Sequence, residues 1–260
     1  MTTSPDLSGW TVSLDLWGTL IVHGDRAAVT DWRVAEFTRV LDAFGQARPG
    51  AQIRHAVTAA DRIALHRQRH DGVQPTVGEL LAGVLDPLAV QATAEMLSVL
   101  EVVHTHASLR GCPRPIDGAQ HTLRTLGGTG ARLVLTSNTL STSPQVHRQL
   151  LDDLELSPFF ADMLFSGELG VAKPRPEVFA TVAERAHSTP EKVVHVGDDW
   201  LTDVRGALDA GSRAVHYQPT GRPARPSVLA ITALDQLVDV LSAACLPTDA
   251  AGITRKQDPR

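Results

Sequence analysis

The stretch WTVSLDLWGTL, residues 10–20, decides how the rest of the chain is interpreted. Residues 11–16 are short, apolar and rich in β-branched side chains, which is typical of a buried strand. Asp15 stands at the end of this run, and Gly18-Thr19 then breaks it. The stretch therefore predicts a strand that delivers Asp15 to a loop.

Three further segments place polar side chains next to apolar runs or at the start of a helix. They are Ser137-Asn138 after 133–136, Lys173-Pro174-Arg175-Pro176 followed by Phe179, and Gly197-Asp198-Asp199 after 193–196, followed by Asp203. Ligands of open parallel sheets bind beyond the carboxyl ends of the strands. We therefore expect Asp15, Ser137 and Asp198 to converge.

After Pro113, strand-like and helix-like segments alternate along the chain. We expect strands at 132–137, 162–165, 193–197 and 213–217, and helices at 116–126, 144–153, 176–186, 203–211 and 233–244. Alternation of this kind implies a parallel sheet with helices on both faces. The predicted fold class is α/β, with a Rossmann-like core.

Between residues 25 and 105 no strand-like alternation occurs. Apolar residues instead recur at helical spacing, which predicts helices at 31–44, 54–70, 76–84 and 89–104. This all-helical insert, 25–105, follows the first strand and should cover the ligand-binding edge as a cap. Residues 10–24 and 106–246 then form the core, and residues 1–9 and 247–260 are expected to be flexible.

Composition excludes several classes of protein. The 260 residues are 43% hydrophobic, which is ample for a packed core and argues against disorder. A net charge of −5 argues against binding to nucleic acid or to an anionic membrane. Two cysteines, no signal-like N-terminus and no membrane-length apolar run predict a cytoplasmic protein. The oligomeric state cannot be predicted from the sequence.

The residue types in the four segments suit phosphoryl chemistry. A carboxylate such as Asp15 can attack phosphorus and split one difficult displacement into two easier ones. Mg²⁺ prefers hard oxygen ligands, which Asp15 and Asp198 would supply. A lysine such as Lys173, if it lay beside such a carboxylate, would keep the carboxylate ionised and offset charge on the transferring group.

Together the four segments resemble the haloacid dehalogenase (HAD) superfamily over roughly residues 10–217, with the insert matched only in position and helical character. The resemblance implies a Mg²⁺-dependent phosphatase that acts on a small phosphorylated metabolite through an aspartyl-phosphate at Asp15. It implies Lys173 and Ser137 as further catalytic residues, Thr19, Ser137, Asn138 and Lys173 as phosphate ligands, and Asp15, Asp198 and the Trp17 carbonyl as metal ligands. Asp199 and Asp203 would support this site.

Trp17 departs from the family pattern, because HAD phosphatases usually carry a second Asp there as general acid/base. An indole N–H can donate a hydrogen bond but cannot shuttle a proton at neutral pH. Asp199, Glu168 or His23 could substitute for that acid.

Two other functions also fit the Trp17 substitution. The first is a 2-haloacid dehalogenase, since those relatives carry an aromatic residue at this position and need no metal. The second is a catalytically impaired binding or biosynthetic protein. A Schiff-base phosphonate hydrolase is excluded, because the insert contains no lysine.

Overall fold

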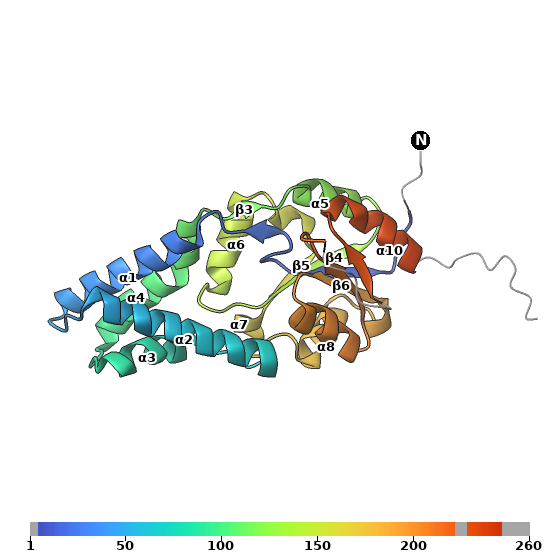
Figure 1. Ribbon diagram of the computed structural model, residues 1–260. Coiled ribbons are helices and arrows are strands. Elements are labelled where there is room, and N and C mark those ends of the chain that lie inside the picture. The colour runs from blue at the N-terminus through green and yellow to red at the C-terminus, as the bar shows by residue number, and fades with distance from the viewer. Residues whose placement is uncertain (1–4, 222–227, 246–260) are drawn as a thin grey trace, which may run out of the picture.

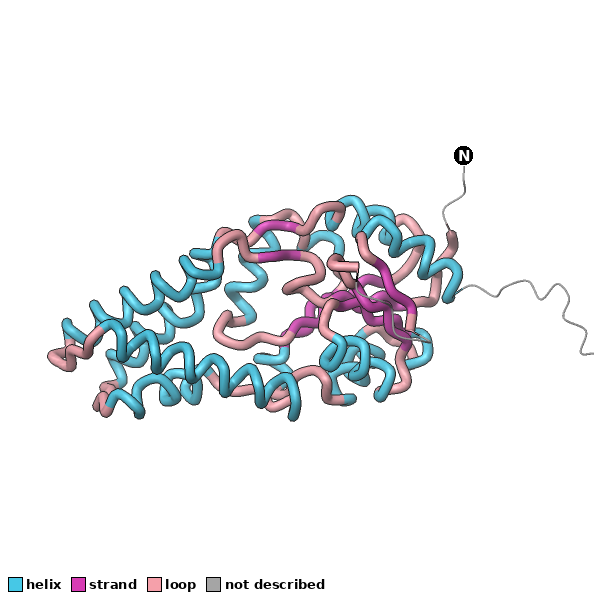
Figure 2. Tube along the Cα trace, viewed as in Figure 1, coloured by secondary structure: helices cyan, strands magenta, loops and turns pink. Residues whose placement is uncertain are grey.

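The computed structural model describes residues 5–221 and 228–245, and these ranges contain a six-stranded parallel sheet (Figures 1 and 2). The strand order is β5-β4-β1-β6-β7-β8. The strands are β1 (Thr11–Leu14), β4 (Arg132–Ser137), β5 (Asp162–Phe165), β6 (Val193–Gly197), β7 (Arg213–Tyr217) and β8 (Leu229–Ile231). The predicted α/β class with a parallel core is confirmed.

Strand β1 lies at the centre of the sheet, as its apolar sequence predicts. All four of its residues are buried, and Leu14 pairs with Leu135 of β4 on one side and Val196 of β6 on the other. The pairing continues one residue further, because the Asp15 backbone N–H donates to the Val196 carbonyl at 2.9 Å. The backbone of Asp15 is therefore fixed by the sheet itself.

Helices cover both faces of the sheet. They are α5 (Ala119–Gly127), α6 (Pro144–Asp153), α7 (Ser166–Leu169), α8 (Pro176–Arg185), the π-helix η5 (Trp200–Arg205), α9 (Gly206–Asp209) and α10 (Leu237–Cys245). Leu135 of β4 packs in one apolar cluster with α5, α6 and α10, while its neighbour Val134 packs in another with α8. Successive strand residues thus face different helical layers.

Four helices between β2 and β3 form a separate helical unit, which extends from one end of the sheet (Figure 1). They are α1 (Arg26–Ala43), α2 (Gly50–Asp71), α3 (Val77–Leu85) and α4 (Ala94–His106). The unit has its own apolar cluster, which includes Phe37, Leu41, Ile53 and Met96. Helix α1 begins five residues before its predicted start, because Asp25 caps it by accepting the Ala28 N–H.

Short elements account for most of the differences from the predicted pattern. The antiparallel pair β2 (Ile21–Val22) and β3 (Arg114–Pro115) joins the helical unit to the core, and two-residue strands leave no periodicity to detect. Strand β8 was also not predicted. The 3₁₀ helices are η1 (Asp86–Leu88), η2 (Ala107–Gly111), η3 (Ser157–Phe159), η4 (Pro190–Lys192) and η6 (Leu234–Gln236).

The two terminal segments were expected to be flexible. Within the first of them, Leu7 is instead fully buried in the core cluster, and its N–H donates to the Thr129 carbonyl. Residues 1–4 and 246–260 lie outside the described residues. No described helix combines the length and the apolar character needed to cross a membrane.

Candidate active site

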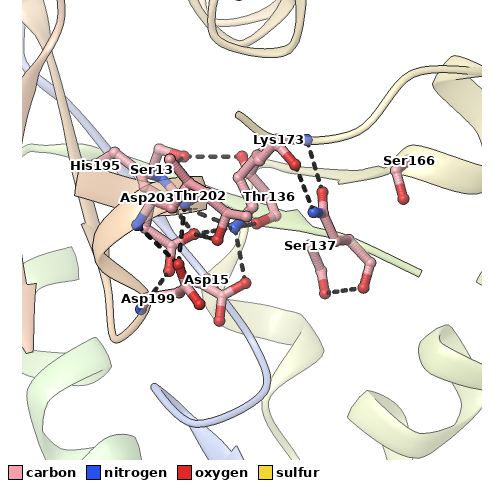
Figure 3. Close-up of polar contacts among 12 residues, drawn as sticks. Ser13, Asp15, Thr136, Ser137, Ser166, Lys173, His195, Asp199, Thr202 and Asp203 are labelled. Atoms are coloured by element: carbon pink, nitrogen blue, oxygen red, sulfur yellow. Dashed lines mark hydrogen bonds and ion pairs between the residues drawn. The ribbon is translucent and has the colours of Figure 1, made fainter. Parts of the chain in front are cut away.

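The four sequence segments meet at the carboxyl edge of the sheet. Asp15 directly follows β1, Ser137 ends β4, and Asp198 directly follows β6. Lys173 reaches the same point from the loop before α8 (Figure 3). The predicted convergence of these side chains therefore occurs, for the reason given by the parallel topology.

Lys173 is the centre of this cluster, although it is almost completely buried. Its Nζ lies 2.8 Å from Asp15 Oδ1 and 2.7 Å from Asp203 Oδ1, and it donates to the Thr136 carbonyl at 2.9 Å. Burial alone would lower the pKa of Lys173, but Asp15 and Asp203 outweigh it and raise that pKa above its ordinary value. The ammonium group is therefore charged at neutral pH.

Asp203 is the second carboxylate that holds Lys173 in place. Its Oδ1 also lies 3.3 Å from His195 Nε2, and its Oδ2 accepts the Asp199 backbone N–H at 2.9 Å. Burial would raise the pKa of Asp203, but Lys173 and His195 hold it well below the ordinary value. Gly197 permits this packing, since a Cβ there would lie 2.3 Å from Asp203 Cγ.

Asp15, Asp198 and Asp203 offer carboxylate oxygens that all lie within 4.8 Å of one another. Burial raises the pKa of Asp15 to about 7, where Asp203 and Asp198 oppose the effect of Lys173. Burial and Asp203 also raise the pKa of Asp198 to about 6. Such mutual repulsion is relieved by a divalent cation, and hard oxygen donors suit Mg²⁺.

Gly18 shapes the same cluster from the loop after β1. Its φ is +87°, and a Cβ at this position would lie 2.5 Å from Asp198 Oδ2. A side chain is therefore excluded both by the backbone conformation and by the close approach of Asp198. The loop that carries Trp17 can thus pass directly beside the acidic cluster, whereas a metal contact by the Trp17 carbonyl stays a prediction.

The predicted phosphate ligands occupy different positions. Ser137 lines a chamber of about 330 Å³ that also contains Asp15, Lys173 and Asp198. The Asn138 side chain is bound instead to the backbone of Lys173, with Nδ2 donating to its carbonyl at 2.9 Å and Oδ1 accepting its N–H at 2.8 Å. Thr19 is fully buried and is not among the lining residues, which argues against contact between its side chain and a ligand.

The indole of Trp17 is held by two histidines. Its Nε1 donates to His147 Nε2 at 2.9 Å, and its ring stacks on His23 with the centroids 4.0 Å apart. Burial lowers the pKa of His147 to about 4, so that ring is neutral and can accept this hydrogen bond. At the sequence position where the family usually carries its second aspartate, this chain therefore has a fixed indole that lines the site.

The three candidates for a replacement acid differ in their access to the site. Glu168 lines neither the Asp15 chamber nor a second chamber beside Trp17, and it pairs with Arg148 at 2.6 Å. Asp199 lines the Asp15 chamber, but its carboxylate binds Arg69 of α2 at 2.7 Å and caps η5. His23 lies against Trp17. Burial and then Arg26 lower the pKa of His23 below its ordinary value.

The cluster opens into two adjoining chambers. The first, of about 330 Å³, contains Asp15, Lys173, Asp198 and Asp203, and the second, of about 480 Å³, lies beside Trp17 and His147. They share a partition made by Trp17, Arg26, Leu65, Asn138 and Leu140. The two volumes together suit a small metabolite.

Sequence reasoning did not identify Arg26, Arg69, His147 or His195 as part of this site. Arg69 and Arg26 come from the helical unit, and no local pattern distinguishes them from solvated arginines. His195 has a weak signal, because a histidine within the apolar run 193–196 must satisfy its ring nitrogens inside the core. It does so through Ser13 Oγ at 2.8 Å and Asp203.

The profile described as haloacid dehalogenase-like hydrolase matches residues 11–211. A phosphoserine phosphatase of Thermus thermophilus is 37% identical over 97 residues, covering 37% of this chain and 38% of the relative. A phosphoglycolate phosphatase of Pseudomonas putida is 29% identical over 206 residues, covering 78% and 67%. The chain spans less than half the length of the first curated relatives it matches.

Solved structures show the same fold. A 2-haloacid dehalogenase from Pseudomonas syringae superposes with a TM-score of 0.64 at 24% identity, covering 90% of this chain and 99% of that one. A HAD-hydrolase from Bacillus subtilis, bound to magnesium, gives 0.59 at 21% identity, covering 90% and 99%. The profile match, which extends over most of the chain, and the convergent site lead to one conclusion: the chain belongs to the haloacid dehalogenase-like hydrolase family and has phosphatases among its relatives.

Proposed function

We propose that this protein is a Mg²⁺-dependent phosphatase that acts on a small phosphorylated molecule through an aspartyl-phosphate at Asp15. The observation that carries the proposal is the position of Lys173, whose ammonium lies between Asp15 and Asp203 at 2.8 and 2.7 Å. This cation keeps a buried carboxylate available as a nucleophile and offsets the charge of a phosphoryl group next to it. The phosphatases among the relatives support the same reaction class.

The first step is attack on phosphorus by a carboxylate oxygen of Asp15. Asp15 Oδ1 accepts from Lys173, which orients the carboxylate toward the chamber. A bond forms between Asp15 and phosphorus while the bond from phosphorus to the leaving oxygen breaks. Water then attacks the phosphorus of this acyl phosphate, which releases inorganic phosphate and restores Asp15.

Asp15 and Asp198 are the residues that would hold Mg²⁺, with the Trp17 carbonyl as a third ligand. When bound, the cation would offset negative charge on the phosphoryl oxygens and on the cluster. Asp203 stays in a supporting position, because Lys173, His195 and the Asp199 N–H already use both of its oxygens. Asp199 orients the loop by capping η5.

The helical unit of α1 to α4 is proposed to act as a cap over the two chambers. Helix α2 supplies Leu65 and Arg69 to the chamber that holds Asp15. Gln68 of the same helix donates to the Thr139 carbonyl at 2.6 Å, which fixes the unit against the core loop after β4. The cap thus places side chains where the leaving group of the substrate must lie.

Trp17 favours one second candidate, a metal-independent 2-haloacid dehalogenase. A halide leaves without protonation, so an indole in place of an acid would cost that reaction nothing. The cluster of Asp198, Asp199 and Asp203 has no role in such a reaction, and for this reason phosphatase chemistry is preferred.

The proposal is tested by thermal denaturation in the presence of Mg²⁺ and beryllium fluoride, which mimics the acyl phosphate. We expect the wild type to be stabilised only when both Mg²⁺ and beryllium fluoride are present, and we expect Asp15→Asn to lose this stabilisation. Asp153→Asn, at an exposed position on α6, is the matched control and should behave as the wild type. Phosphate release from a panel of small phosphate esters should show the same dependence on Mg²⁺ and Asp15. Release of halide from a 2-haloacid without metal, with no response to beryllium fluoride, would favour the second candidate instead.

A further inference from the structure

The chamber beside Trp17 has a charge opposite to that of the whole protein. The protein carries a net charge of −5, yet the charged residues that line this chamber are Arg26, Arg33, Arg62 and a single aspartate, Asp61. Arg33 and Asp61 bind each other through two hydrogen bonds. The positive charge that remains comes from Arg26 and Arg62.

Among residues 5–221 and 228–245, neither Arg26 nor Arg62 makes an ion pair or a side-chain hydrogen bond. Most other arginines of the helical unit behave differently: Arg54 pairs with Asp31 at 2.8 Å and Arg69 with Asp199 at 2.7 Å. Arg26 lines both chambers, so this residue lies at the partition between the Asp15 cluster and this second space.

Helix α1 adds to this positive potential. Arg26, Val29, Thr30 and Arg33, which form one face of its first two turns, all line the chamber. The first turn of this 18-residue helix contains no acidic residue that would offset its partial positive charge, although its cap, Asp25, carries a carboxylate. The N-terminus and the two unpaired arginines thus act on the same space.

From these observations we infer that the second chamber is an anion subsite, which holds a carboxylate or a second phosphate on the leaving group of the substrate. This inference rests on the proposed phosphatase reaction, because it places the phosphoryl group at Asp15 and the rest of the molecule beside Trp17. The partition residues are common to both chambers, so one short molecule can occupy both. Arg26 and Arg62 are specificity-determining residues that bind the second anion by charge-assisted hydrogen bonds.

The test compares phosphate esters that differ in one charged group. Phosphoserine and phosphoethanolamine differ by a carboxylate, as do 3-phosphoglycerate and glycerol 3-phosphate, whereas fructose 1,6-bisphosphate and fructose 6-phosphate differ by a phosphate. In at least one pair we expect kcat/KM to be about tenfold or more higher for the more anionic member, mainly through KM. The pair that shows the preference identifies whether the anion is a carboxylate or a phosphate.

The preference should depend on the two arginines. In an Arg26→Gln/Arg62→Gln double variant it should fall to about twofold or less, because kcat/KM of the more anionic member, which loses its contact with the extra anion, should fall much further than that of the less charged member. Both side chains are exposed, so the variant is expected to fold, and its melting temperature verifies this. Arg67→Gln, which removes an exposed arginine of α2 that does not line this chamber, is the matched control and should retain the preference.

Two outcomes separate this inference from the proposed reaction. Equal hydrolysis of both members of every pair would overturn the anion subsite and leave the phosphatase intact. If no ester is hydrolysed, the proposed reaction fails, and calorimetric titration of Asp15→Asn with the same pairs decides on the subsite. Tighter binding of the more anionic member, lost in the double arginine variant, supports the subsite, whereas equal binding overturns it.

Discussion

Trp17 sets the chemistry of this site at the scale of a single residue. Its indole N–H donates to His147 and its ring stacks on His23, so the side chain offers no proton to a leaving oxygen. Proton donation by a well-placed acid typically contributes about 10²–10⁴-fold to the rate. A phosphatase with this residue should therefore be most effective on esters whose leaving group needs little protonation.

Replacing Trp17 by an acid tests this interpretation. We expect Trp17→Asp to raise kcat for an alkyl phosphate by up to about 10²-fold, and to raise it less for p-nitrophenyl phosphate, whose leaving group departs unprotonated. Rates should be measured well below the melting temperature, because removing the indole also removes packing against the core.

Trp17→Asn is the control for this experiment, since it creates the same space without a titratable proton. If the Asp and Asn variants accelerate both esters equally, Trp17 only shapes the pocket and another group already supplies the proton. His23, which touches the indole, is then the first residue to replace.

At the scale of elements, strands that lie inside the sheet could be predicted well. The run 132–137 and the run 193–197 match β4 and β6 residue for residue, because a strand buried on both faces is mostly apolar. Strands β2 and β8 could not be predicted, since each has at most three residues and depends on its partner. The predicted start of α1 was also displaced, because its actual start is set by the cap Asp25 and not by the apolar pattern.

The contact of α2 with the core is an element-scale feature that can be tested at Gln68. This buried side chain donates to the Thr139 carbonyl at 2.6 Å and to Gln74 Oε1 at 2.8 Å. Gln68→Met keeps the length of the side chain but leaves the carbonyl without this donor. We expect the free energy of unfolding to fall by about 1–3 kcal/mol. KM should rise, because α2 lines the substrate chambers.

Urea denaturation and steady-state kinetics measure the two effects of Gln68→Met. Gln52→Met, on an exposed position of the same helix, should change neither quantity by a comparable amount. A Gln68 variant with unaltered stability and KM would mean that the helical unit is held over the site by other contacts, such as the one between Arg69 and Asp199.

At the scale of the whole molecule, the position of the site could be predicted but its internal contacts could not. The parallel topology alone brings Asp15, Ser137 and Asp198 to one edge of the sheet, so their proximity could be predicted. The roles of Asn138 and Thr19 depend on side-chain directions: one binds the Lys173 backbone and the other is buried away from the chamber. No spacing in the sequence encodes those directions.

Stability of the whole molecule should depend on pH through a histidine far from the reaction. His104 of α4 is buried against Phe37, and neither ring nitrogen has a hydrogen-bond partner among the described residues. Burial, and then Arg33, lower its pKa to about 3, whereas an unfolded histidine titrates near 6.5. Between these values the unfolded chain binds a proton that the folded chain does not, so stability falls as the pH falls below about 6.5.

His104→Leu removes this penalty. Relative to the wild type, we expect the variant to gain about 2 kcal/mol more unfolding free energy at pH 5 than at pH 8, which is the cost of one proton bound by a group of pKa 6.5. Urea denaturation at the two pH values measures the difference, and any constant effect of repacking cancels. His121→Leu, at an exposed position, should give no such difference. An equal change at both pH values would show that the folded protein and the unfolded chain protonate His104 over the same pH range.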